Sequence, residues 1–244
     1  MLDVSAIGSP LQFFRENSAA IGPQLQLLIW GLGLLCVDFL IPAGKKNRGA
    51  IYALFGIGMA SIHLYWRGVI PGAAFYKMIV LDRFALYFDG LFLAAAFLAV
   101  LMSYRYLDVE EEQHTEYYAL ILFATSGMMF MAGAVDLVTI FVGLELMSIS
   151  TYVLVGFLRG RKRSNEASMK YFLMGAFSTG IILYGMSLLY GLSGSTNLNE
   201  ISLQVGALGE NTLFVLALLM VMVGLCFKVA AVPFHMWVPD AYEG

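Results

Sequence analysis

The hydrophobic residues of this chain fall into long, nearly uninterrupted runs, without the alternation of a half-buried strand or the polar face of a soluble helix. Each run is close to the roughly 20 residues that a helix needs to cross a membrane. Short stretches rich in Pro, Gly or charge separate the runs. The pattern predicts an all-α, polytopic membrane helix bundle with about seven transmembrane helices. They span roughly 21–41, 49–66, 83–104, 117–134, 137–158 and 166–191, and a seventh starts near 213 and is broken at Pro233.

The connections between the predicted helices carry their own signals. Residues 1–20 are mixed and are expected to form a lead-in or an interfacial helix. Residues 67–82, 105–116 and 193–211 are expected to be loops, the second of them acidic and solvated. Asp136 is placed to cap the start of the fifth predicted helix.

Composition supports the membrane interpretation. The chain is 60% hydrophobic and 13% charged, against about 25% charged in soluble domains, and its mean hydropathy is +0.78. We therefore expect a lipid bilayer as its surroundings, and the net charge of −3 argues against a nucleic-acid partner. Cys36 and Cys226 both lie inside apolar runs, so neither a disulfide nor an iron–sulfur or metal centre is predicted. The N-terminus lacks the pattern of a cleaved signal peptide.

The distribution of basic residues between the predicted helices indicates how the chain is oriented in the membrane. Lys45, Lys46 and Arg48 follow the first predicted helix, and a second basic cluster at 159–163 follows the fifth, so both lie on the same side. The positive-inside rule makes that side cytoplasmic and puts the N-terminus outside. The loop at 67–83, with three basic residues, argues weakly against this orientation.

Lys228 is the first unusual residue, because it ends a long apolar run only five residues before Pro233. A lysine within hydrocarbon costs about 3 kcal/mol and is retained where it faces protein or water. A broken helix at membrane depth is tolerated where it lines a cavity or is buried in protein. The two features together mark a candidate functional site.

Glu145 is the second unusual residue, since it lies about two turns from either end of its predicted helix. Phe141, Glu145, Ser148 and Tyr152 recur at helical spacing, so they form one unusually polar stripe. Either Glu145 is a protonated side chain that only aids helix packing, or it takes part in chemistry with a cation. A unit charge about 5 Å away contributes about 3 kcal/mol at an effective dielectric constant of about 20. Neutralising or moving Glu145 would then decide whether Lys228 keeps its proton.

Other ionisable residues carry weaker signals. Lys170 follows Glu166 by one turn, so a simple helical ion pair competes with a role in a proton path. His235 follows the break and either satisfies freed backbone carbonyls or passes protons. A last group is expected to serve packing, solvent contact or the membrane interface: His63, His114, Asp38, Asp82 and Asp89. No phosphate-binding loop, dinucleotide-binding turn or nucleophile–base spacing is evident.

The stretch from Gly224 to Gly244, GLCFKVAAVPFHMWVPDAYEG, resembles the subunit N family of proton-pumping NADH:quinone oxidoreductase, respiratory complex I. The stretches LDRFA from Leu81, GLELMSISTYVLVGF from Gly143, NEASMKYFLMGAFS from Asn165 and YGMSLLYG from Tyr184 agree with it. The resemblance implies an antiporter-like fold with two inverted five-helix repeats. It matches the key glutamate of that fold to Glu145, its key lysine to Lys228 and a further lysine to Lys170.

The same resemblance implies the division of the chain and its partners. Residues 1–20 would be the lead-in, 21–116 three N-terminal helices, and 117–244 a first repeat that is incomplete at its end. The chain is expected to be a fragment of a longer protein that continues into a second repeat. It would bind no cofactor itself, while NADH, FMN, iron–sulfur clusters and quinone are bound by other subunits. Its partners would be other membrane-arm subunits, the bilayer and protons.

Two other functions remain open at this point. Subunits of multisubunit sodium/proton antiporters and of membrane-bound hydrogenases share the fold that the resemblance implies. A purely structural membrane subunit would use the buried pair only to fix the register of its helices.

Overall fold

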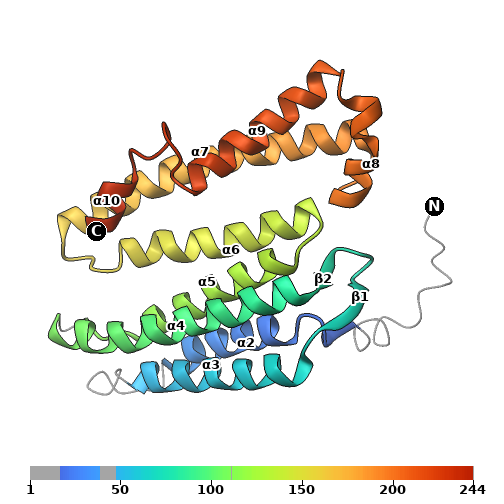
Figure 1. The fold of residues 1–244 in the computed structure, drawn as a ribbon. Coiled ribbons are helices and arrows are strands. Elements are labelled where there is room, and N and C mark those ends of the chain that lie inside the picture. The colour runs from blue at the N-terminus through green and yellow to red at the C-terminus, as the bar shows by residue number, and fades with distance from the viewer. Residues whose placement is uncertain (1–16, 39–47, 111, 244) are drawn as a thin grey trace. The chain divides into compact units, whose positions relative to one another are not determined.

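The computed structural model describes residues 17–38, 48–110 and 112–243, and within these ranges it contains nine helices and one two-stranded sheet (Figure 1). Most of the expected lead-in, residues 1–16, and the Lys45/Lys46 loop lie outside the described residues. The chain divides into two compact units, Met1–Ala134 and Val135–Gly244. Each unit is described by itself below.

Four long helices build the first unit: α2 (Gly22–Asp38), α3 (Arg48–Arg67), α4 (Arg83–Val109) and α5 (Thr115–Gly133). Helix α5 packs against the other three, and more than half of its residues are buried. Asp82 caps α4 by accepting a hydrogen bond from the Ala85 amide. The four helices match the predicted ones, except that α4 continues to Val109 through part of the expected acidic loop.

A β-hairpin occupies most of the segment 67–82, which was predicted to be a loop. Strands β1 (Ile70–Ala74) and β2 (Ile79–Leu81) pair antiparallel, and the turn between them holds three residues at positive φ, from Phe75 to Lys77. The buried side chains of Ile79 and Leu81 pack in a cluster with Ala20 and Ile21. The prediction of a simple loop was wrong because the turn lacks the Gly or Asn that usually marks positive φ.

The expectation that Asp89 is exposed at the interface was also wrong. Asp89 is fully buried, and its Oδ2 lies 3.0 Å from an Nη2 of Arg67, whose side chain is only 2% exposed. Gln24 Nε2 lies 3.3 Å from the same oxygen, and Arg67 Nη1 donates to the Ala20 carbonyl. Helices α2, α3 and α4 therefore meet around a buried ion pair.

The second unit is built around α7 (Lys162–Ser193), which packs against α6 (Leu137–Val155), α9 (Thr212–Lys228), α8 (Leu198–Leu208) and α10 (Val238–Glu243). Figure 1 shows α9 running alongside α7, with α10 beside the N-terminal part of α7. Asp136 caps α6 as predicted, accepting from the amides of Val138 and Thr139.

Helix α8 lies inside the segment predicted as a polar loop. Asn197 starts it by accepting hydrogen bonds from the Asn199 and Glu200 amides. Only Ile201 of this helix is buried, and it joins the hydrophobic cluster around Phe214 and Ile182. The helix was missed because it is short, with 11 residues, and lies within a segment that also contains Gly, Ser and Asn.

The predicted break in the seventh long helix is present but begins earlier than Pro233. Helix α9 ends at Lys228, and helical structure resumes at Val238 after a series of turns. Proline has no amide hydrogen for the carbonyl four residues back, Val229, and its ring clashes with that carbonyl. The proline alone would allow a helix up to the residue before it. The helix ends already at Lys228 because Ala230 adopts a positive φ of 54°, and the Ala231 amide there donates to the Cys226 carbonyl.

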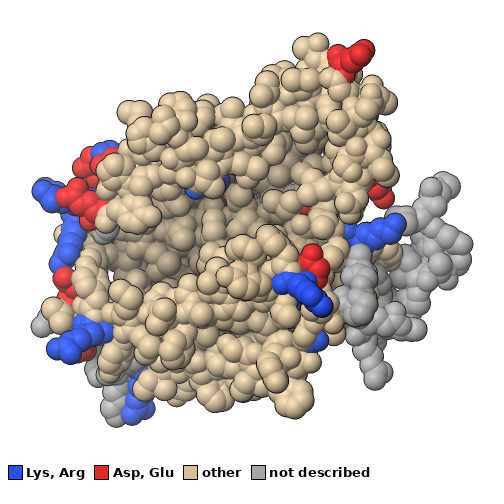
Figure 2. All heavy atoms as spheres, in the orientation of Figure 1, with Lys and Arg blue, Asp and Glu red and all other residues tan. Residues whose placement is uncertain are grey.

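Among the described helices, α3, α4, α6 and α7 are long and apolar enough to cross a membrane, and α9 is a shorter apolar helix. On the face that Figure 2 shows, most charged side chains lie near the edges, and tan surface covers most of the area between them apart from a small blue patch near the middle. This distribution is the one expected for helices surrounded by lipid.

Candidate functional site

Lys228 lies at the C-terminal end of α9 with its side chain only 8% exposed. Its Nζ donates to Ser148 Oγ and to Tyr152 Oη, each at 2.9 Å. The same nitrogen lies 5.5 Å from the centre of the Tyr152 ring. Two hydroxyl oxygens of α6 therefore hold the ammonium group in place.

Glu145 provides the opposite charge. Its Oε1 lies 3.6 Å from Lys228 Nζ and accepts a hydrogen bond of 2.8 Å from Thr179 Oγ1 of α7. The glutamate side chain is 22% exposed, so the pair is shielded but its acid is the more accessible partner. Three helices, α6, α7 and α9, thus supply one cluster of an acid, an amine and three hydroxyls.

The spacing of the α6 residues explains the cluster. Glu145, Ser148 and Tyr152 follow each other by three and four positions, so they share one face of the helix. Gly175 of α7 leaves room for the tyrosine, since a Cβ there would lie 2.1 Å from the Tyr152 hydroxyl oxygen. The polar stripe predicted from sequence thus faces Lys228, although the role of these residues in proton transfer stays a prediction.

Lys170 and His235 lie apart from the pair. Lys170 forms an ion pair with Glu166 at 2.8 Å, as its spacing predicts, and a second one with Asp240 of α10 at 3.2 Å. His235 is exposed in the turns after α9, and its side chain makes no hydrogen bond or ion pair with any described residue. Neither residue contacts Glu145 or Lys228.

Thr179 and Asp240 are the polar contacts that the sequence reasoning missed. Thr179 follows Ser178 in the otherwise apolar middle of α7, and this pair of hydroxyl residues was the only available signal. Ser178 makes a different hydrogen bond. Its Oγ donates to the Gly224 carbonyl at 3.0 Å and so joins α7 to α9.

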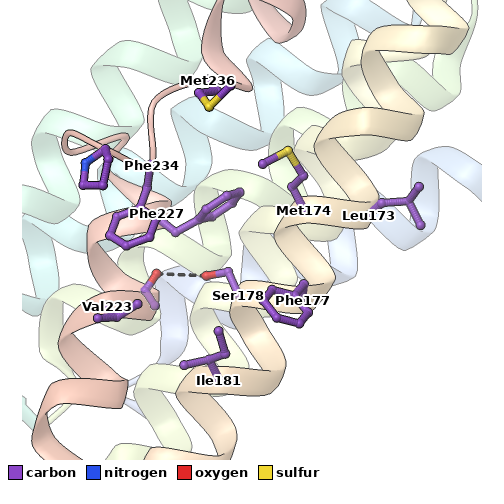
Figure 3. Close-up of a pocket in the computed structure, with 11 residues that line it drawn as sticks. Leu173, Met174, Phe177, Ser178, Ile181, Val223, Phe227, Phe234 and Met236 are labelled. Atoms are coloured by element: carbon purple, nitrogen blue, oxygen red, sulfur yellow. Dashed lines mark hydrogen bonds between the residues drawn. The ribbon is translucent and has the colours of Figure 1, made fainter.

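An apolar pocket of about 390 Å³ lies between α7, the C-terminal part of α9 and the turns after α9 (Figure 3). Phe227 and Phe234 line it from the side of the break, and Met174 and Phe177 line it from α7. No charged side chain lines this pocket. Within the described ranges, no group of three or more His, Cys, Asp or Glu side chains is placed to hold a metal ion.

Comparison with known proteins identifies relatives of the chain. Residues 134–244 match the family model described as "NADH:quinone oxidoreductase/Mrp antiporter, TM". NADH-quinone oxidoreductase subunit N 1 of Koribacter versatilis is 50% identical over 236 residues, which cover 91% of this chain and 46% of the relative. Subunit N of Trichlorobacter lovleyi is 48% identical over 239 residues, covering 96% of this chain and 48% of the relative.

A solved structure agrees with these relatives. Respiratory complex I from Thermus thermophilus with bound aureothin contains a chain that is 32% identical, with a TM-score of 0.73, over 91% of this chain and 47% of that one. The resemblance indicated by the sequence motifs and the antiporter-like membrane helix fold are thereby confirmed. The chain spans about half the length of the curated relatives it matches.

Proposed function

We propose that this chain, a relative of NADH-quinone oxidoreductase subunit N, translocates protons as part of the membrane arm of such a complex. The observation that carries the proposal is the shielded pair of Glu145 and Lys228, held 3.6 Å apart between three apolar helices. An intramembrane ionisable residue is a functional-site candidate by default, and here two of opposite charge meet.

The proposed chemistry is proton holding and release at Lys228 Nζ. With Glu145 ionised, the carboxylate and the hydroxyls of Ser148 and Tyr152 favour the ammonium form of the lysine. When Glu145 is protonated or moves away, the contribution of the carboxylate is lost while the two hydroxyls remain, and the ammonium gives up its proton. Hydroxyl groups both donate and accept hydrogen bonds, so they are suited to passing that proton on.

Other subunits would supply the redox reaction. We propose that NADH, FMN, iron–sulfur clusters and quinone bind elsewhere in the complex, and that electron transfer there drives the protonation changes here. Lys170 and His235 remain proposed members of the path leading to and from the pair, since both are accessible in this chain.

The proposed location is a bacterial plasma membrane with the N-terminus outside. Support comes from the basic cluster at 159–163, which would face the cytoplasm. Arg67, one of the residues that argued for the reverse orientation, is buried in an ion pair with Asp89. It therefore does not act as an exposed loop cation.

The test replaces Lys228 with Ala in the full-length protein within its complex and follows NADH-driven acidification of inverted membrane vesicles. We expect translocation through this subunit to be lost, so that fewer protons move per electron. Lys162→Ala, an exposed lysine at the start of α7, is the control and should leave the ratio unchanged. A normal ratio in Lys228→Ala would refute the proposal, and a normal ratio in a Glu145→Gln, Lys228→Met double variant would favour a structural role.

The same vesicles can be used to determine whether protons or sodium ions are the coupling ion. If protons move directly, a sodium ionophore leaves acidification unchanged and a protonophore abolishes it. Acidification that depends on added sodium would favour the antiporter alternative.

A further inference from the structure

Trp237 lies in the break between α9 and α10, yet its side chain is buried, with 9% exposed. Its ring is stacked on Tyr171 of α7, with centroids 4.4 Å apart and planes 5° apart. On α9 it meets Phe227, with centroids 5.6 Å apart and planes 25° apart. The indole therefore packs against both α7 and the end of α9.

Both contacts of the indole lead to Lys228. Tyr171 packs edge-to-face on Tyr152 at 4.6 Å, and Tyr152 Oη accepts the hydrogen bond from Lys228 Nζ. Phe227 directly precedes Lys228 in α9. Stacked and edge-to-face aromatic pairs have defined geometries, so the position of one ring constrains the next.

Two ion pairs hold the segment after Trp237 against α7. Lys170 pairs with Asp240 at 3.2 Å, and Arg163 pairs with Glu243 at 2.6 Å. All four side chains are substantially exposed, and such pairs contribute little stability individually. The ion pairs therefore orient α10, and the buried ring stack supplies most of the attachment.

We propose that Trp237 is a positioning residue for Lys228, an inference that rests on the proposed function. Its indole keeps the broken helix packed against α7 and holds Tyr171 against Tyr152. The Tyr152 hydroxyl thereby stays within hydrogen-bonding distance of the lysine amine. Removing the ring would let Tyr152 move, and the amine would lose one of its two hydroxyl partners.

The indole N–H is not needed for this role. Trp237 Nε1 is buried and has no hydrogen-bond partner among the described residues. Phenylalanine keeps a flat ring without the N–H, whereas leucine keeps apolar bulk without a flat ring. The proposal therefore predicts different translocation rates for Trp237→Phe and Trp237→Leu.

The experiment measures NADH-driven proton translocation by the full-length protein in its complex, with the amount of assembled complex determined in parallel. Trp237→Leu should lower the rate per complex about tenfold, the scale of losing a hydrogen bond to a charged group. Trp237→Phe should stay near the wild-type rate. Met236→Leu, at the exposed neighbouring position, is the matched control.

A double-mutant cycle tests whether Trp237 acts through Tyr152. If it does, Trp237→Leu should have little further effect in a Tyr152→Phe background, because the hydroxyl it positions is already absent. Additive losses, a normal rate in Trp237→Leu, or equal losses in the Phe and Leu variants would each overturn the proposal.

A second pair of variants covers the case in which Trp237→Leu fails to assemble. Tyr171→Leu should then lower the translocation rate and Tyr171→Phe should not. A normal rate in Tyr171→Leu with a lowered rate in Tyr171→Phe would overturn the proposal.

The Lys228→Ala variant distinguishes failure of the positioning role from failure of the proposed function. Normal translocation in Lys228→Ala refutes the proposed function, whereas its loss together with a normal Trp237→Leu rate refutes only the positioning role.

Discussion

At the scale of single residues, Thr179 completes the carboxylate side of the cluster. Its hydroxyl donates to Glu145 Oε1 at 2.8 Å, and Thr179 is the α7 residue that bonds this acid. Valine has the same shape without the hydroxyl, so Thr179→Val would leave the carboxylate less fixed opposite Lys228.

We expect Thr179→Val to lower NADH-driven proton translocation by up to about tenfold, because the lost hydrogen bond is to a charged group but the site is partly exposed. Thr179→Ser, which keeps the hydroxyl, should retain the rate. The measurement is acidification of vesicles per electron transferred. Equal rates in the Val and Ser variants would show that the hydroxyl does not matter.

Single residues also show what the sequence can reveal. Glu145 and Lys228 stand out because a charge inside an apolar run needs an explanation, and the structure does place them together. Asp89 was misjudged because its environment depends on Arg67, 22 positions away on another helix. Burial of that kind depends on which helices pack together, which the local pattern does not contain.

At the scale of elements, close packing of α7 and α9 supports the site. A Cβ on Gly224 would lie 2.1 Å from Ile182 Cγ1 and 3.1 Å from the Ser178 carbonyl oxygen. Ser178 also bonds the Gly224 carbonyl, so the two helices touch along their backbones. Small residues at such contacts are typical of helix packing in membranes.

Gly224→Ala should therefore destabilise the protein by about 1–3 kcal/mol through overpacking. Gly180→Ala is the matched control, since nothing lies within 4 Å of a Cβ there and alanine favours a helix. Thermal denaturation of the purified complex, followed through release of this subunit, measures the difference. Equal denaturation temperatures in the two variants would contradict the close contact.

The elements differ in how far their sequences specify them. Long apolar runs predicted the seven long helices well, and Asp136 and Pro233 gave correct local signals. The β-hairpin and α8 were missed because both depend on packing of a few side chains, Ile79 and Leu81 in one case and Ile201 in the other. Short elements of this kind carry too few residues for a periodic pattern.

At the scale of the whole molecule, the first unit has its own buried ion pair, Arg67 with Asp89. Removing one partner of a buried pair leaves an uncompensated charge and costs about 3–5 kcal/mol, whereas replacing both costs much less. The pair is therefore expected to stabilise the bundle of α2, α3 and α4 without taking part in proton transfer.

Asp89→Asn should lower the amount of complex assembled in the membrane, and Asp89→Leu with Arg67→Met should recover much of it. Asp108→Asn, at an exposed position near the end of α4, is the control. Complexes that do assemble should move the wild-type number of protons per electron. A changed ratio in those complexes would place the pair within the proton path instead.

The length of α7 gives the depth of the Lys228 site. Lys170 is the last charged residue at the N-terminal end of α7, and Thr179 follows it by nine residues, or about 14 Å at 1.5 Å per residue. Thr179 bonds Glu145, whereas the Tyr152 hydroxyl that binds Lys228 lies against Gly175, five residues or about 8 Å along α7 from Lys170. Measured from Lys170 into a hydrocarbon layer about 30 Å thick, the acid therefore lies near the midplane and the amine nearer to the Lys170 side. Under the proposed function, a proton that entered from the Lys170 side and reached Lys228 would have crossed no more than about half of the membrane voltage, which corresponds to at most about 1.2 kcal/mol per 100 mV.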